Sequence, residues 1–186
     1  LSRDEILDRI KGIRDSIGSN NLPNIYLLSG EFNDQELNEL YNHPKVKAMF
    51  CLTKGEGFGR PLLEFSLTGK PIIVSGWSGH VDFLHKDYVS LLPGSLEKVH
   101  PSAANNWLIE EAQWFKVDDN TSIKRIKEVY KKYKHFHKLS QKQKYHAKKN
   151  FSYDKMVEIV NKSLEKNVPE IAQQVKLNLS QLTKVD

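Results

Sequence analysis

Two carboxylates, Glu56 and Glu64, lie eight positions apart in the segment 55–64, which reads G-E-G-F-G-R-P-L-L-E. The segment follows an apolar run at 48–52 and precedes another at 71–74. A glycine turn between a strand and a helix presents backbone N–H groups, and the helix dipole favours an anion there. Carboxylates beside such a turn can accept hydrogen bonds from hydroxyl groups. The pattern therefore predicts a site for a phosphate or sugar-phosphate ligand.

The elements that would position this segment are helices alternating with short apolar strands. A capping box at Ser2 and Glu5 and the stop at Gly18 delimit the first helix. The run 46–52 is apolar almost throughout, as is typical of a strand buried on both faces. The predicted strands are 24–28, 46–52, 71–74 and 89–92, and the predicted helices are 2–17, 34–41, 61–68 and 79–84. This alternation predicts a parallel α/β sheet that binds its ligand at the carboxyl ends of the strands.

The pattern changes after residue 92. Residues 93–117, with Trp107 and Trp114, show little periodicity, which leaves a functional loop or a packed surface excursion. Helical periodicity then extends from 121 to about 167. Its apolar stripes are Ile123, Ile126, Val129, Tyr130 and Tyr133, and then Met156, Val157, Val160 and Leu164. We therefore expect one domain over 1–167 and a tail over 168–186 that could form a further helix.

Bulk composition limits the function only broadly. The 186 residues fit one ordinary domain, and the formal net charge of +5 suits a nucleotide sugar, an anionic membrane surface or nucleic acid. Cys51 is the chain's only cysteine, which excludes an internal disulfide and suits a reducing compartment. Because it lies in an apolar run, we expect a buried, inert thiol. No apolar run reaches the length of a spanning helix, so we expect a cytoplasmic protein, with association at a membrane surface left open.

The segment 55–64 resembles the signature of retaining glycosyltransferases with the GT-B fold, the large group-1 class known as glycosyltransferase family 4. That family carries two glutamates in an E-x7-E arrangement, which Glu56 and Glu64 match. Four further segments resemble family motifs in the family's order, and these are 28–41, 69–75, 78–84 and 151–155. The resemblance covers about residues 24–165.

The resemblance implies a Rossmann-like donor domain, the second half of a GT-B enzyme, which binds a nucleoside diphosphate sugar. It implies hexosyl transfer with retained configuration and without a metal or other cofactor. A glycan, lipid or other acceptor would bind through an N-terminal domain that is missing, as are the first strand of the donor domain and the basic pair that holds the diphosphate. The chain begins with Leu on a helical pattern, so we expect a fragment that binds donor weakly and is inactive alone.

The resemblance also assigns roles to residues. Glu56 is the expected catalytic residue, which accepts hydrogen bonds from the donor sugar, and Glu64 accepts them from the ribose. The alternative interpretation of Glu64 is a helix-surface or capping carboxylate. The other expected donor-binding residues are Gly57, Phe58 and Gly59 near the sugar and phosphate, Leu62 and Leu63 near the nucleotide, and Ser29 and Gly30 at the base. Lys54 and Arg60 flank the glycine turn and could help with the phosphate, although they do not match the family's basic pair.

Two polar features have structural readings beside functional ones. Asp118 and Asp119 stand at a predicted helix start, where capping explains them better than metal binding does. His80 lies in the second glycine turn and could face either the site or the surface.

A lysine-rich stretch at 131–149 leaves further alternatives open. A solvated helix face is the favoured reading, and the functional ones are an anionic membrane surface or nucleic acid. Nucleic acid would need stacking aromatics among the basic residues. Tyr130, Tyr133 and Phe136 instead recur at core-like spacing, so we expect no nucleic-acid partner. A basic nucleic-acid-binding module and a non-catalytic interaction domain remain the alternatives to an enzyme.

Overall fold

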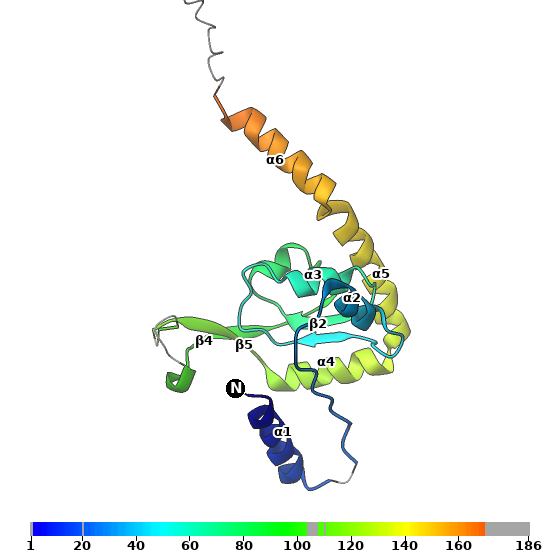
Figure 1. Ribbon diagram of the computed structural model, residues 1–186, viewed down its shortest axis with the longest axis vertical. Coiled ribbons are helices and arrows are strands. Elements are labelled where there is room, and N and C mark those ends of the chain that lie inside the picture. The colour runs from blue at the N-terminus through cyan, green and yellow to red at the C-terminus, as the bar shows by residue number, and fades with distance from the viewer. Residues whose placement is uncertain (1, 20, 104–107, 110, 170–186) are drawn as a thin grey trace, which may run out of the picture. The chain divides into compact units, whose positions relative to one another are not determined.

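The computed structural model describes residues 2–19, 21–103, 108–109 and 111–169 (Figure 1). The chain divides into two compact units, Leu1–Val46 and Lys47–Asp186, and each unit is described by itself. The domain expected over 1–167 spans both units and stays a prediction. Trp107 and nearly all of the tail expected over 168–186 lie outside the described residues.

The first unit holds two helices whose ends are set by local hydrogen bonds. Helix α1 (Arg3–Ile17) begins with the predicted capping box of Ser2 and Glu5 and ends at Gly18, which has φ 63°. Helix α2 (Asp34–Asn42) begins with a second capping box, formed by Asn33 and Glu36. Both predicted helices are therefore confirmed.

The predicted strand over 24–28 is wrong, because the described backbone there is in no β-ladder. Ile25, Tyr26 and Leu28 are exposed within the structure, at 54%, 82% and 59%. A strand forms only by pairing with another strand, so an apolar run is insufficient by itself.

The second unit contains a parallel sheet of three described strands, β1 (Met49–Cys51), β2 (Ile72–Ser75) and β3 (Ser90–Leu92). Strand β2 lies between the other two, with Val74 opposite both Cys51 and Leu91. The predicted parallel α/β arrangement is confirmed at this level, and it is compatible with a Rossmann-like fold. Burial on both faces holds for β2 and not for β1, where Phe50 is 46% exposed, because β1 is an edge strand of the described sheet.

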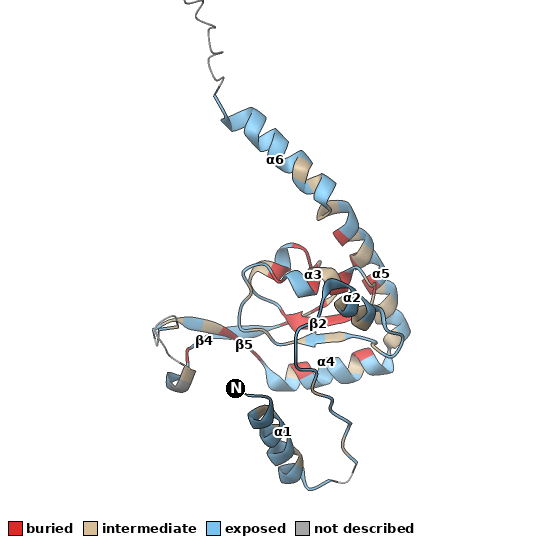
Figure 2. Ribbon diagram, viewed as in Figure 1, coloured by how far each residue is buried: buried red, intermediate tan, exposed pale blue. Residues whose placement is uncertain are grey.

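Helices lie on both sides of these strands. Figure 1 shows α3 (Arg60–Ser66) and α4 (Asp119–Lys131) on opposite sides of the sheet. The predicted helical region beyond 121 is confirmed as α4, α5 (Tyr133–Asn150) and α6 (Tyr153–Asn167), and 79–84 instead forms a 3-10 helix, η1 (Gly79–Asp82). Helix α6 buries none of its residues (Figure 2). Its predicted apolar stripe is exposed at Met156, Val160 and Leu164 and half-buried at Val157. Each helix in the described ranges is too short or too polar to cross a bilayer.

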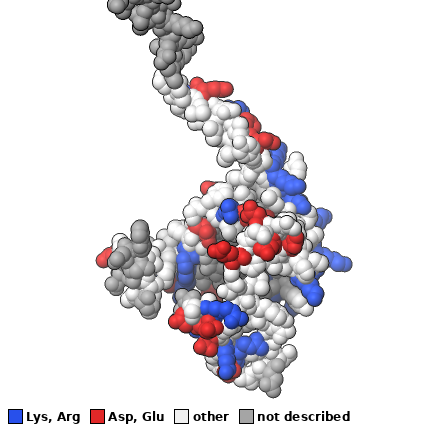
Figure 3. Space-filling view, viewed as in Figure 1, with Lys and Arg blue, Asp and Glu red and all other residues white. Residues whose placement is uncertain are grey.

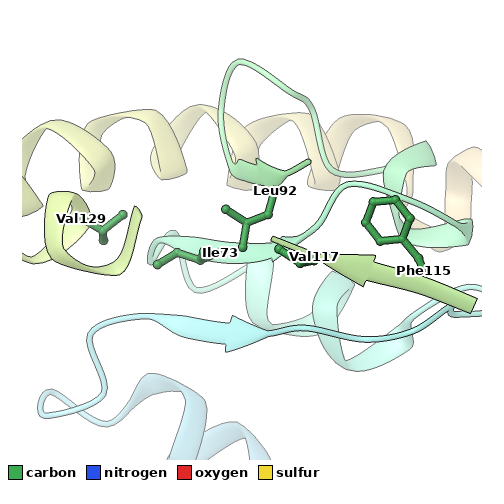
Figure 4. Close-up of a cluster of buried hydrophobic side chains, with 5 residues drawn as sticks. All are labelled: Ile73, Leu92, Phe115, Val117 and Val129. Carbon is green, nitrogen blue, oxygen red and sulfur yellow. The ribbon is translucent and has the colours of Figure 1, made fainter. Parts of the chain in front are cut away.

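A cluster of buried apolar side chains joins the sheet to α4. The cluster comprises Ile73, Leu92, Phe115, Val117 and Val129 (Figure 4). The predicted α4 stripe is only partly right, since Val129 is 4% exposed whereas Tyr130 is 85% exposed and Ile123 is 49% exposed. These two residues lie about a quarter turn around the helix from the buried face.

Residues 93–117 contain two strands that the sequence did not suggest. Strand β4 (Gly94–Lys98) pairs antiparallel with β5 (Gln113–Val117), and a short 3-10 helix, η2 (Pro101–Ala103), follows β4. Every residue of β4 is exposed, so this strand has no buried face to impose an apolar alternation. Strand β5 buries Phe115 and Val117, and it attaches the hairpin to the core.

Gln143 connects α5 to the chain that follows η1. This residue is 1% exposed; its amide accepts from the N–H of His85 at 2.9 Å and donates to the carbonyl of Phe83 at 2.7 Å. We expect Gln143→Leu to lower the free energy of unfolding by about 1–3 kcal/mol for each backbone group left without a partner. Chemical denaturation measures this, with the exposed α5 substitution Lys148→Leu as control. Equal stability of the two variants would contradict the prediction.

Candidate functional site

The carboxyl ends of the parallel strands carry two connected segments. Loop 52–59 follows β1, and turn 76–79 follows β2. The N–H of Gly76 donates to the carbonyl of Leu92, the last residue of β3, at 2.8 Å. The hairpin joins the loop as well, since the N–H of Phe115 donates to the carbonyl of Lys54 at 3.0 Å. The candidate site is therefore attached to all three described parallel strands.

Both backbone polar groups of Glu56 are satisfied by the turn after β2. Its N–H donates to Ser78 Oγ at 2.9 Å. Its carbonyl accepts from the Ser78 hydroxyl at 2.6 Å and from the N–H of Gly79 at 3.0 Å. The Glu56 residue itself is half-buried. The backbone is thus fixed at the residue for which the sequence predicts catalysis.

The three residues after Glu56 differ in how closely they are packed. A Cβ added to Gly57 would meet nothing within 4 Å, so this backbone faces open space. Phe58 is 47% exposed, with its ring centroid 5.0 Å from that of Phe83. Gly59 is buried and precedes α3 with φ 86°, a conformation that favours glycine. The loop therefore presents its backbone at Gly57 and packs at Gly59.

Arg60 and Glu64, two of the predicted donor-binding residues, contact each other. Arg60 Nε lies 3.1 Å from Glu64 Oε1, and the side chains are 74% and 37% exposed. This geometry fits the interpretation of Glu64 as a helix-surface carboxylate. Exposed ion pairs of this kind contribute little to stability, so the pair does not prevent Glu64 from binding a ligand.

The remaining predicted residues lie in varied surroundings. Leu62 is buried at 3% exposure and Leu63 is half-buried, so the Leu62 side chain packs inside the unit. The Lys54 ammonium lies 5.0 Å from the centroid of the Trp114 ring and lines a surface groove of about 410 Å³ along the hairpin. Ser29 and Gly30 belong to the first unit, and their predicted position at a strand end is wrong because 24–28 forms no strand.

His80 packs against the loop at Gly59, since a Cβ added to Gly59 would lie 3.1 Å from His80 Cβ. It is fully buried, and its Nε2 lies 2.6 Å from the carbonyl oxygen of Ser75. A carbonyl only accepts, so Nε2 carries the proton. The Nδ1 atom is buried without a hydrogen-bond partner among the described residues. Surface placement of His80, one of the two predicted options, is therefore wrong.

Ser78 is a site residue that sequence reasoning missed. A serine before a short helix is normally interpreted as its N-cap, and nothing in the sequence links it to a loop 22 positions earlier. Only the parallel pairing of β1 with β2 brings the two segments together.

The structure also tests the predicted helix cap at Asp118 and the predicted burial of Cys51. Asp118 is the N-cap of α4 and accepts from the N–H of Thr121 at 2.6 Å, and hydrogen bonds from Thr121 lower the pKa of its carboxyl group. Cys51 is half-buried, and desolvation raises the pKa of its thiol.

No group of three or more His, Cys, Asp or Glu side chains in the described part of the chain is placed to hold a metal ion. Metal independence stays a prediction.

Comparison with known proteins adds no assignment. No protein-family model matches the chain, and no curated protein is similar to it. The resemblance to glycosyltransferases rests on the five sequence segments.

Proposed function

We propose that this chain is the donor-binding part of a retaining glycosyltransferase with the GT-B fold. The observation that carries the proposal is the position of the E-x7-E segment, which starts on the loop after β1 and ends in α3. Open α/β sheets bind ligands in this region, at the carboxyl ends of parallel strands. The four other segments in family order support the same family.

The proposed reaction moves a sugar from a nucleoside diphosphate sugar to an acceptor hydroxyl. The bond between the anomeric carbon and the diphosphate oxygen breaks, and the acceptor oxygen bonds to the same carbon on the same face. The departing phosphate takes the acceptor proton. The protein positions the reactants and stabilises the charge of the leaving diphosphate. Glu56 holds the sugar hydroxyls, and the open backbone at Gly57 lets the donor approach.

Arg60 and Glu64, which form an ion pair with each other in this structure, would both contact the donor when it binds. Donor binding would replace the ion pair by contacts from Glu64 to the ribose hydroxyls and from Arg60 to the diphosphate. The pair is exposed, and its opening costs little because water and salt already screen it.

The test of this function is ligand-observed NMR on the chain with UDP, GDP and ADP and their glucose or mannose conjugates. We expect one nucleotide to bind, and we expect Glu64→Ala to weaken that binding about tenfold or more, since a charged group that hydrogen-bonds the ribose is lost. Glu97→Ala, at an exposed hairpin position, is the matched control. Binding that is equal in both variants would contradict the role of Glu64, and no binding to any nucleotide would contradict the donor site in this chain.

A second candidate function, nucleic-acid binding, is favoured by one feature of α5. Figure 3 shows Lys and Arg side chains gathered where this helix lies. Tyr145 is 68% exposed between Lys142 and Lys149, and the three line a surface groove of about 500 Å³ with Tyr88 and His146. Exposed aromatics among cations suit single-stranded nucleic acid. Salt-dependent binding of single-stranded RNA, without binding of any nucleotide sugar, would favour this function.

A further inference from the structure

We propose that Ser78 is a positioning residue that holds the Glu56 loop in its ligand-binding form. The assignment of a ligand to this loop rests on the proposed function. The fixing of the loop by Ser78 rests on contacts alone.

The turn after β2 runs along the glycine loop residue by residue. Trp77 lies beside Gly55, since a Cβ added to Gly55 would be 3.2 Å from Trp77 Cζ3. The Ser78 hydroxyl is hydrogen-bonded to both the N–H and the carbonyl of Glu56, on the two sides of its Cα atom. Gly79 lies against the backbone of Gly57 and leaves no room there for a Cβ of its own. His80, the next residue, lies beside Gly59, since a Cβ added to Gly59 would be 3.1 Å from His80 Cβ.

Ser78 adopts a backbone conformation that a serine rarely takes. Its φ is 87° and its ψ is −171°. Among the described residues, Ser78 is the only non-glycine residue with a positive φ. L-residues are strained in this region, and glycine is not. Some other property must therefore favour serine over glycine at this position.

The hydroxyl group supplies that property. Ser78 stands at the N-cap of η1, yet its side chain makes no capping hydrogen bond to that helix. The hydroxyl is used instead on Glu56, where it accepts from the N–H at 2.9 Å and donates to the carbonyl at 2.6 Å. Fixing the backbone of Glu56 on both sides of its Cα atom fixes the direction of its Cα–Cβ bond, from which the carboxylate extends. A site held in this way before the ligand arrives loses less conformational freedom on binding.

Two substitutions separate this role from a purely structural one. Ser78→Gly leaves the Glu56 N–H without its partner, which lowers stability, and relieves the backbone strain, which raises it. We therefore expect a melting temperature close to that of the wild-type chain. Ser78→Thr keeps the hydroxyl and adds a β-branched side chain at positive φ, so we expect a lower melting temperature. If Ser78 mattered only for stability, the variant with the lower melting temperature would also show the faster Glu56 amide exchange and the weaker nucleotide binding.

The experiment measures amide hydrogen exchange by NMR on the ligand-free chain, followed by titration with UDP, GDP and ADP. We expect the Glu56 amide to exchange about tenfold faster in Ser78→Gly and at the wild-type rate in Ser78→Thr. Affinity for the bound nucleotide should fall about tenfold in Ser78→Gly only. Unchanged exchange in Ser78→Gly, or faster exchange with full affinity, would overturn the proposal. If the wild-type chain binds none of the three, the proposed function fails, and the exchange rates still decide whether Ser78 fixes Glu56.

Discussion

Replacement of Glu56 by alanine is expected to lower the rate of sugar transfer at least about a hundredfold without unfolding the protein. The size of the effect follows from the proposed function, in which Glu56 is a charged group that contacts the reacting sugar. Retention of the fold follows from the structure, because the three hydrogen bonds that hold Glu56 among the described residues all involve its backbone. Under the proposed function, the measurement is kcat/KM of sugar transfer by a protein in which this chain is joined to an acceptor-binding domain, together with a thermal melt of each variant.

Two variants test whether the charge of Glu56 or the loop as a whole is responsible. Glu56→Gln keeps the length and most of the shape of the side chain, so a loss as large as that of Glu56→Ala would identify the charge as the decisive property. Glu97→Ala removes an exposed carboxylate from the hairpin and should retain wild-type turnover. Near-normal turnover of Glu56→Ala would remove this residue from the catalytic machinery.

Gly57→Val is expected to abolish nucleotide binding without loss of stability, whereas Gly79→Ala is expected to lower stability. Gly57→Val should melt like the wild-type chain, because its Cβ meets no described atom within 4 Å, and should lose nucleotide binding, because its side chain occupies the space through which a ligand reaches the backbone. Gly79→Ala should lose stability by about 1–3 kcal/mol or more, since its Cβ would collide with the backbone of Gly57. Thermal melts and nucleotide titrations of the chain distinguish the two.

Gly12→Ala is the control for this pair. Gly12 lies within α1, where a Cβ also meets nothing within 4 Å, so alanine should leave nucleotide binding unchanged. Full affinity of Gly57→Val would show that no ligand approaches the loop at that residue. Wild-type stability of Gly79→Ala would show that the turn can move away from the loop.

Helix ends were predictable because the interactions that set them are local. Ser2 and Asp118 each accept a hydrogen bond from a backbone N–H three residues later, and both were predicted as caps. Strands depend on partners far along the chain, which explains the two errors. The apolar run 24–28 has no partner strand in the part of the chain that the structure describes, and the exposed strand β4 forms only because it pairs with β5.

The candidate site was predictable in part for the same reason. The glycine loop and its two glutamates follow one another in sequence, so their position after a strand could be inferred from the apolar run that precedes them. The contact between Ser78 and Glu56 depends on the pairing of β1 with β2, and the burial of His80 depends on the packing of η1. No local pattern in the sequence encodes either of these arrangements.

The state of Cys51 has a practical consequence for labelling. Desolvation raises the pKa of its thiol, so at neutral pH the thiolate is scarcer than the few per cent typical of a free cysteine. A cysteine introduced at an exposed hairpin position, such as Leu96→Cys, should therefore react with a maleimide well before Cys51 does. A fluorophore attached there would follow the hairpin, whose second strand is hydrogen-bonded to the glycine loop, while the natural cysteine stays in place.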